Sequence, residues 1–240
     1  MRLSNDFWLL NKPIAHRGLW GKDLIENSLS AYKNAVDNGY PIEIDLYSSA
    51  DGVLFSFHDA LLKRMTGSDG LIYEKTAKQL KSLHLLDSNE EIPTFDEVLS
   101  LINGKVPLLI ELKDQPDKTY VDKVVERLKT YNGEFAIQSF NPLYIKRVKK
   151  LAPEFIRGIL ATKTHSKHLP FIKRQIVKNM LLNFIIKPDF ISYSFEDLPL
   201  RKSKLKKTPL ISWTITSQVD YEKVKPFVKN IIFEHFIPNK

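Results

Sequence analysis

Residues 94–112 read TFDEVLSLINGKVPLLIEL, and this stretch carries the signals of a helix followed by those of a strand. Thr94 and Glu97 have the spacing of a capping box, and the apolar residues behind them recur at helical spacing. Asn103-Gly104 predicts the end of this helix, because glycine is favoured just beyond a helix C-terminus. Residues 106–112 are almost continuously apolar, which is typical of a strand covered on both faces in a parallel sheet.

The same order of helix and strand recurs along the chain. We expect a helix over residues 28–38 with Ser28 as its cap, and another around residues 121–128 that stops at Asn132-Gly133. Asn141-Pro142 predicts a further helix start, because a capping residue precedes a proline. This alternation is typical of βαβ units and a parallel sheet. The candidate strands are residues 14–16, 42–45, 54–57, 106–112, 135–138, 155–160, 190–193, 210–214 and 231–234.

Nine candidate strands are one more than a closed (β/α)8 barrel needs. Only eight residues separate Asp45 from the candidate strand at residues 54–57, which is too few for a helical crossover. We therefore expect residues 54–57 to lie outside the barrel. The length of 240 residues suits one such barrel. The sequence thus predicts an α/β protein with the (β/α)8 TIM-barrel fold, a single domain over residues 1–240, and a short β-hairpin or loop insertion near residues 46–93.

The composition excludes several classes of protein. There is no cysteine, which excludes disulfide frameworks and thiolate metal sites. The longest apolar-rich stretch, residues 176–186, contains one lysine and two asparagines and is too short to span a bilayer. The apolar run at the N-terminus is too short for a secretory signal, and no cleavage site follows it. We therefore expect a soluble, cytoplasmic protein.

The net charge of +8 is concentrated in basic stretches such as residues 201–207. Their simplest interpretation is a set of solvated helix faces. The functional alternatives are attraction of an anionic substrate and weak contact with an anionic membrane surface. No nucleic-acid motif accompanies the charge, so we expect no nucleic-acid partner. The oligomeric state stays open at this point.

Carboxylates gather at the ends of two candidate strands, where the chemistry of a (β/α)8 barrel is found. Glu43 and Asp45 are two residues apart and point to the same face of a strand, and Glu111 follows from a neighbouring strand. Like charges on one inward face repel unless a cation lies between them. An all-oxygen site suits Mg²⁺ or Ca²⁺ and disfavours zinc. The alternative is that Arg17 or Lys113 pairs with these carboxylates as buried ion pairs.

Two histidines also follow candidate strands. His16 and His58 each could be a satisfied core histidine, but together, beside the carboxylates, they favour a general acid and a general base. Asp59 either orients an imidazole or caps a turn. Arg17 offers a planar fork suited to phosphate, and Lys113 offers a point charge unless it only pairs with Glu111. Of the remaining histidines, His84, His165 and His168 are expected at the surface, and His235 beside Glu234 stays open.

The ordered set of these motifs resembles the glycerophosphodiester phosphodiesterase family. The resemblance implies a (β/α)8 barrel that hydrolyses glycerophosphodiesters to sn-glycerol 3-phosphate and an alcohol with one divalent cation. It also implies that His16 and His58 are the acid and base, that Arg17 and Lys113 contact phosphate, and that Trp213 lies near the substrate. The metal ligands that it implies are Glu43, Asp45 and Glu111. The motifs are His16-Arg17-Gly18, Glu26-Asn27-Ser28, Glu43-Ile44-Asp45, Asp51-Gly52, His58-Asp59, Glu111-Leu112-Lys113, Ser139-Phe140, Gly158-Ile159-Leu160 and Trp213-Thr214.

The chain departs from the family pattern at several positions. Ile25 replaces a usual proline, Thr216 replaces a usual asparagine, and Phe233-Glu234-His235 replaces a usual Thr-Asp pair. The last two departures bear on substrate choice more than on catalysis. Residues 64–93 are short compared with longer relatives, so we expect an open mouth. Two alternatives follow: a lysophospholipase D-type enzyme with an apolar rim, and a catalytically silent, anion-binding barrel. The rim residues would be Leu61, Leu62, Met65, Leu71 and Ile72, unless they pack in the core.

Overall fold

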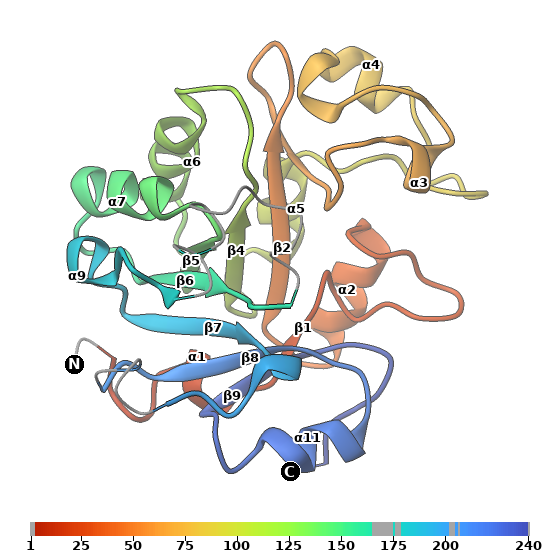
Figure 1. Cartoon of the computed structure of the whole chain (residues 1–240). Coiled ribbons are helices and arrows are strands. Elements are labelled where there is room, and N and C mark those ends of the chain that lie inside the picture. The colour runs from red at the N-terminus through yellow and green to blue at the C-terminus, as the bar shows by residue number, and fades with distance from the viewer. Residues whose placement is uncertain (1–2, 165–174, 176–178, 202–204, 206, 240) are drawn as a thin grey trace. The chain divides into compact units, whose positions relative to one another are not determined.

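The computed structural model describes residues 3–164, 175, 179–201, 205 and 207–239 (Figure 1). The elements fall into two compact units, one formed by Arg17–Phe135 and the other by Met1–His16 with Ala136–Lys240. His165, His168 and most of the basic stretch at residues 201–207 lie outside the described residues.

The unit Arg17–Phe135 is built around two parallel strands. β2 (Ile42–Ser48) and β4 (Leu108–Leu112) pair in register, with Asp45 opposite Glu111. Every residue of both strands is buried, and for β4 this confirms the prediction from the apolar run at residues 106–112. The helices of this unit are α2 (Leu29–Asp37), α3 (Lys63–Thr66), the 3-10 helix η1 (Ile72–Glu74), α4 (Ala77–Lys81), α5 (Phe95–Ile102) and α6 (Tyr120–Lys129).

The strand β3 (Leu54–Ser56) folds back on β2 as a hairpin. The two strands are antiparallel, with Leu46 opposite Ser56. Gly52 lies in the connecting turn with a φ of 91°, a left-handed conformation that favours glycine. The expectation that residues 54–57 stand apart from the parallel strands is confirmed, because the connection from β2 is too short for a helix.

The chain between β3 and α5 forms an insertion whose apolar core also includes one residue of β2 and one of β3. Leu62, Met65 and Ile72 are buried in it, whereas Leu61 keeps 59% of its surface exposed. Packing in a core, rather than an apolar rim, is therefore the role of these three residues. The insertion also contacts the hairpin turn, since the backbone N–H of Ala77 donates to Asp51 at 2.8 Å. The core consists of Tyr47, Phe55, Phe57, Leu62, Met65, Ile72, Leu80, Leu85 and Ile92.

The unit that contains both chain ends holds the other parallel strands, in the order β1-β9-β8-β7-β6-β5. No helix in the described part of the chain is long and apolar enough to cross a membrane. The strands are β1 (Ile14–Ala15), β5 (Phe135–Ser139), β6 (Arg157–Ala161), β7 (Phe190–Ser194), β8 (Leu210–Ile215) and β9 (Asn230–Phe233). The helices are α1 (Trp8–Asn11), α7 (Pro142–Leu151), α9 (Asn183–Ile186), the 3-10 helix η2 (Phe195–Asp197) and α11 (Gln218–Val224).

Several helix boundaries follow the side-chain signals in the sequence. The side chains of Ser28, Thr94 and Asn141 each accept a hydrogen bond from a backbone N–H in the first turn of the helix that follows. Asn103 ends α5 in the left-handed conformation with a φ of 45°. These caps were predicted from the sequence and are confirmed.

The end of α6 differs from the prediction. This helix stops at Lys129 rather than at Asn132-Gly133. The hydroxyl of Thr130 donates to the backbone carbonyl of Arg127 at 3.0 Å. A threonine side chain that bonds to the preceding turn competes with the helical backbone, which accounts for the earlier end.

Candidate active site

Three carboxylates from β2 and β4 meet in the interior of the unit Arg17–Phe135. Glu43 and Asp45 point to the same side of β2, and Glu111 lies on β4 opposite Asp45. One oxygen of each carboxylate lies within 4.8 Å of the others, and all three residues are buried. The sequence spacing therefore predicted a cluster that exists.

Burial and mutual repulsion both act on these carboxylates. Burial raises the pKa of Glu43 well above its usual range, and the charges of Asp45 and Glu111 raise it further. A cation between the carboxylates would relieve that repulsion, and carboxylate oxygens are ligands that Mg²⁺ and Ca²⁺ prefer. Glu43, Asp45 and Glu111 could therefore hold a divalent metal ion.

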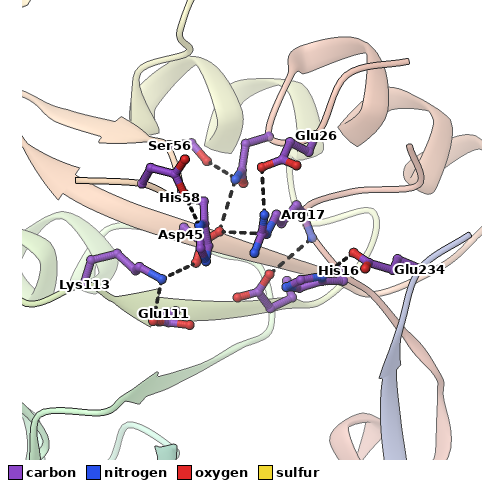
Figure 2. Close-up of polar contacts among 12 residues, drawn as sticks. His16, Arg17, Glu26, Asp45, Ser56, His58, Glu111, Lys113 and Glu234 are labelled. Carbon is purple, nitrogen blue, oxygen red and sulfur yellow. Dashed lines mark hydrogen bonds and ion pairs between the residues drawn. The ribbon is translucent and has the colours of Figure 1, made fainter. Parts of the chain in front are cut away.

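Two cationic side chains also contact the carboxylate cluster. The amine of Lys113 lies 2.9 Å from Glu111 and 3.3 Å from Asp45, and Nε of Arg17 lies 3.6 Å from Asp45 (Figure 2). Burial lowers the pKa of Lys113, but Asp45 and Glu111 outweigh it and hold the value above the usual range. The predicted alternative of buried ion pairs is thus realised in part, at Asp45 and Glu111.

The loop that precedes α2 holds Arg17 beside this cluster. The backbone N–H of Arg17 donates to Glu43 at 3.2 Å, and Nη1 donates to Glu26 at 2.8 Å. Gly18 lets the loop approach α2, because a Cβ there would lie 2.9 Å from the carbonyl carbon of Ala31. The guanidinium lies between Glu26 and Asp45 (Figure 2), where its planar fork suits a phosphate group.

A buried chain of hydrogen bonds connects Asp45 to Asn27, Tyr32 and Ser56. The side-chain amide of Asn27 donates to Asp45 at 3.1 Å, and the hydroxyl of Tyr32 donates to the amide oxygen of Asn27 at 2.7 Å. The hydroxyl of Ser56 lies 2.5 Å from that of Tyr32. Because buried polar groups that are fully paired rigidify their surroundings, this chain fixes the orientation of the Asp45 carboxylate.

His58 follows β3 and is oriented by the next residue. Its Nδ1 lies 2.6 Å from an oxygen of Asp59. The pKa of Asp59 is raised by burial, but hydrogen bonds from His58 and Arg64 outweigh burial and hold it below its usual value. An ionised carboxylate only accepts hydrogen bonds, so Nδ1 of His58 carries the proton and Nε2 is the acceptor nitrogen of the ring. Of the two roles considered for Asp59, the structure favours orienting the imidazole.

Arg64, on α3, joins the surroundings of His58 to those of Arg17. Its Nε donates to Asp59 at 2.5 Å. Its two terminal nitrogens donate to the carboxylate of Glu26 at 3.1 and 2.6 Å, and Glu26 in turn accepts from Arg17. Glu26 therefore lies between two guanidinium groups, whose hydrogen bonds outweigh burial and lower its pKa.

The unit that contains both chain ends holds His16, which is paired with Glu234. The Nδ1 of His16 lies 2.7 Å from a carboxylate oxygen of Glu234, just beyond β9 (Figure 2). Only 14% of the His16 side chain and 16% of the Glu234 side chain are exposed. As with His58, a carboxylate at Nδ1 favours the tautomer that carries its proton on Nδ1.

The comparison with protein families follows the same residues. Residues 16–235 match the Glycerophosphoryl diester phosphodiesterase family. The chain belongs to this family. The match begins at His16 and ends just after Glu234, so it includes both histidines and all three clustered carboxylates.

Relatives with assigned names share this family. The chain is 35% identical over 161 residues to the glycerophosphodiester phosphodiesterase of Caldanaerobacter subterraneus subsp. tengcongensis, covering 61% of this chain and 65% of the relative. It is 24% identical over 250 residues to human glycerophosphodiester phosphodiesterase 1, covering 85% and 71%. The matched part thus spans just under two thirds of the length of the first relative.

Solved structures of the family have the same fold. A phosphodiesterase of Oleispira antarctica, solved in complex with the product sn-glycerol 3-phosphate, aligns with a TM-score of 0.79 and 25% identity over 95% of this chain and 94% of its own. The glycerophosphodiester phosphodiesterase of Thermotoga maritima aligns with a TM-score of 0.72 and 22% identity over 93% and 94%. The predicted (β/α)8 TIM-barrel fold is confirmed.

The remaining predicted positions have clear locations but no assigned role. Trp213, on β8, is half-buried and packs edge-on against Phe140, with ring centroids 5.6 Å apart. His84 is exposed, as expected. His235 is 47% exposed and lies 3.8 Å from Glu234. The role of Trp213 at the substrate stays a prediction.

Sequence reasoning missed four residues around the site. Arg64 and Ser56 carried no recognised signal, and Tyr32 fitted the apolar stripe of a helix. Glu234 was noted only as a departure from the family pattern. Each of the four has at least one partner that is distant in the chain, such as Glu234 and His16, which are 218 residues apart. The family motif Glu26-Asn27-Ser28 was the one signal that could have directed attention to this network.

Proposed function

We propose that this protein is a glycerophosphodiester phosphodiesterase that hydrolyses its substrate to sn-glycerol 3-phosphate and an alcohol with one divalent cation. The observation that carries the proposal is the buried cluster of Glu43, Asp45 and Glu111 with Arg17 and Lys113 in contact. Membership of the family supports the reaction. The product found in the Oleispira antarctica enzyme supports the substrate class.

The proposed binding roles follow from charge. Glu43, Asp45 and Glu111 are the ligands of Mg²⁺ or Ca²⁺, and the choice between these ions stays open. The bound cation would neutralise charge that builds up on the phosphate during displacement. The planar guanidinium of Arg17 donates paired hydrogen bonds to the phosphate oxygens, and the ammonium of Lys113 attracts them as a point charge. The side chains of Arg17 and Lys113 are already held beside the carboxylates, so they need little reorganisation when the substrate binds.

The proposed acid and base are His16 and His58. One imidazole takes the proton of the attacking hydroxyl as the new bond to phosphorus forms. The other gives a proton to the alcohol oxygen as its bond to phosphorus breaks. The attacking group is water or the glycerol 2-hydroxyl, which in the second case gives a cyclic phosphate first. In both residues a carboxylate at Nδ1 directs Nε2 to this task.

The partner that we propose is a small glycerophosphodiester, and Trp213 is proposed to contact it. A nucleic-acid partner is not expected. Weak contact with an anionic membrane surface, a role in lipid or glycerol metabolism, and a cytoplasmic location stay predictions from the sequence. The single domain spanning residues 1–240 likewise stays a prediction.

The structure gives less support to the lysophospholipid alternative than the sequence did. Its cue was an apolar rim after His58, but Leu62, Met65 and Ile72 are buried in the core of the insertion. The silent-barrel alternative is disfavoured because three buried carboxylates are costly to hold together without a cation to bind.

The proposal is tested by measuring glycerol 3-phosphate released from glycerophosphocholine and glycerophosphoethanolamine, with Mg²⁺, with Ca²⁺ and with chelator. Release that depends on the metal and is lost in His58→Ala is the expected result. No release from either substrate under any of these conditions would contradict the proposal, and release from lysophosphatidylcholine micelles alone would support the alternative.

A further inference from the structure

We propose that Arg64 is a positioning residue of this enzyme, which holds His58 and Arg17 in their working orientations through Asp59 and Glu26. The inference rests on the proposed function, in which His58 transfers a proton and Arg17 contacts the phosphate. It adds a residue from the insertion, α3, to the parts that determine the geometry of the site.

The link to His58 runs through Asp59. One carboxylate oxygen of Asp59 lies 2.6 Å from Nδ1 of His58, and the other accepts from Nε of Arg64 at 2.5 Å. Both oxygens are thus engaged from opposite partners, which leaves the carboxylate little freedom to rotate. The imidazole ring, 30% exposed, would otherwise be free to turn about its side-chain bonds.

The link to Arg17 runs through Glu26. Arg64 donates to both carboxylate oxygens of Glu26, at 3.1 and 2.6 Å, in the two-pronged geometry typical of strong guanidinium–carboxylate pairs. Glu26 is 7% exposed and also accepts from Arg17 at 2.8 Å. Without Arg64, Glu26 would keep one guanidinium partner, and its second oxygen would lose its contact with Arg64.

The helix that carries Arg64 is anchored by its neighbours. Leu62 and Met65 are buried in the core of the insertion, and the backbone carbonyl of Met65 accepts from the N–H of Leu86. Arg64 itself is 47% exposed. A lone exposed ion pair contributes little, but Arg64 makes three directed hydrogen bonds to two carboxylates that are mostly buried. Arg64 therefore acts as a clamp, by which we mean a residue that fixes the carboxylates of Asp59 and Glu26 at the same time.

The main test compares Arg64→Gln with Lys63→Gln on the same helix. Lys63 forms an exposed ion pair with Asp69 and has no hydrogen bond or ion pair with a site residue in the described part of the chain, so it serves as the matched control. We expect Arg64→Gln to lower kcat by about 10- to 100-fold, because misplacement of reacting groups by about 1 Å has effects of that size. Lys63→Gln should stay within twofold of the wild type. Arg64→Lys should lie between wild type and Arg64→Gln, since an amine cannot form the fork.

A double-mutant cycle shows whether Arg64 acts through Asp59. If it does, Arg64→Gln combined with Asp59→Asn lowers kcat little more than Asp59→Asn alone, because both substitutions break one chain. Losses that multiply would overturn the link to His58. A change in kcat below threefold for Arg64→Gln, in protein whose melting temperature matches that of Arg64→Lys, would overturn the whole inference.

A spectroscopic readout separates this inference from the proposed function. The ¹⁵N chemical shifts of His58 in the full chain report which ring nitrogen carries the proton, whether or not the protein is active. We expect a protonated Nδ1 in the wild type and in Lys63→Gln, and altered ¹⁵N shifts of His58 in Arg64→Gln. If the wild type releases no glycerol 3-phosphate, the proposed function fails, and unchanged His58 shifts in Arg64→Gln would additionally overturn the clamp.

Discussion

Asp45 lies directly opposite Glu111 in the register of the parallel strands β2 and β4, and the amine of Lys113 contacts both carboxylates. The backbone pairing therefore determines how closely the two negative charges approach. Strands are rigid supports, so the cluster does not depend on loop conformation. Sites built in this way are ready to bind a cation with little change in shape.

The carboxylate cluster should make the protein more stable when a divalent cation is present. At a free ion concentration of 100 times Kd, binding stabilises the folded state by about 2.7 kcal/mol. Glu43→Gln removes a proposed ligand and also a carboxylate whose pKa burial and like charges raise. We expect this variant to lose most of the rise in Tm with Mg²⁺ or Ca²⁺, yet to be at least as stable as the wild type in chelator.

The control for this prediction is Glu126→Gln, on the exposed side of α6. It should show the same Tm rise with metal as the wild type. Differential scanning fluorimetry with and without EDTA measures both values. A full metal-induced shift in Glu43→Gln would contradict the assignment of Glu43 as a ligand.

Acid should remove the stabilisation that Asp59 provides. The folded-state pKa of Asp59 lies below the ordinary value of about 3.9, so its contribution is present above that value and is lost as the pH falls through the folded-state pKa. The difference in free energy of unfolding between wild type and Asp59→Asn should therefore be largest near pH 7 and shrink below about pH 4. Urea unfolding at pH 7, 5, 4 and 3 measures it, with the exposed Asp69→Asn as control.

The hydroxyl of Tyr32 should support both the fold and the metal site. Tyr32→Phe removes the hydrogen bond to Asn27, which holds Asp45, and the contact with Ser56. Leaving buried polar groups without a partner costs about 1–3 kcal/mol, so the variant should unfold at a lower urea concentration and bind Mg²⁺ more weakly by calorimetry.

Tyr73→Phe, in the insertion, is a suitable comparison for Tyr32→Phe. Tyr73 is half-buried and its ring lies near that of Tyr47, but within the described residues its hydroxyl makes no hydrogen bond to the carboxylates. This variant should change the free energy of unfolding by no more than about 0.5 kcal/mol. Equal effects of the two substitutions would argue against a special role for the Tyr32 hydroxyl.

Much of the fold could be predicted because its signals are local. Helix caps such as Thr94 act within three or four residues, and the continuous apolar run of β4 marks a buried strand. The hairpin strand β3 was recognised from the length of its connection alone. The end of α6 was mispredicted because the side chain of Thr130 bonds backward to the helix, a contact that the Asn132-Gly133 signal does not contain.

The site could be predicted where the period of a strand decides it, and not where tertiary contacts do. Glu43 and Asp45 share a face because alternate residues of a strand do. In contrast, Arg64 reaches Glu26 across 38 residues of sequence, and no periodicity relates the two. The residues alone indicated His16 and His58 as candidates for catalysis, and Asp59 was one possible orienting residue, but the contacts of Arg64 and Glu234 emerged only from the folded chain.

Glu234 should orient His16 rather than take part in the reaction. Its carboxylate contacts Nδ1 of His16 at 2.7 Å, so Glu234→Gln would weaken the preference for the tautomer that carries its proton on Nδ1. We expect kcat to fall by about 10- to 100-fold with little change in KM, because substrate binding does not need this carboxylate. His235→Gln, next in the chain and about half exposed, should stay within about threefold of wild type.

The insertion offers the sharpest comparison, because adjacent leucines differ completely in burial. Leu62 is fully buried in the core of the insertion, whereas Leu61 is 59% exposed. Leu62→Ala should destabilise the protein by about 2–5 kcal/mol, since it removes buried side-chain contacts and leaves a cavity. Leu61→Ala should change stability by less than about 0.5 kcal/mol. Because Leu62 lies at the start of α3, Leu62→Ala should also lower kcat by displacing Arg64. A larger effect of Leu61→Ala than of Leu62→Ala on lysophospholipid turnover would instead support the lysophospholipase alternative with its apolar rim.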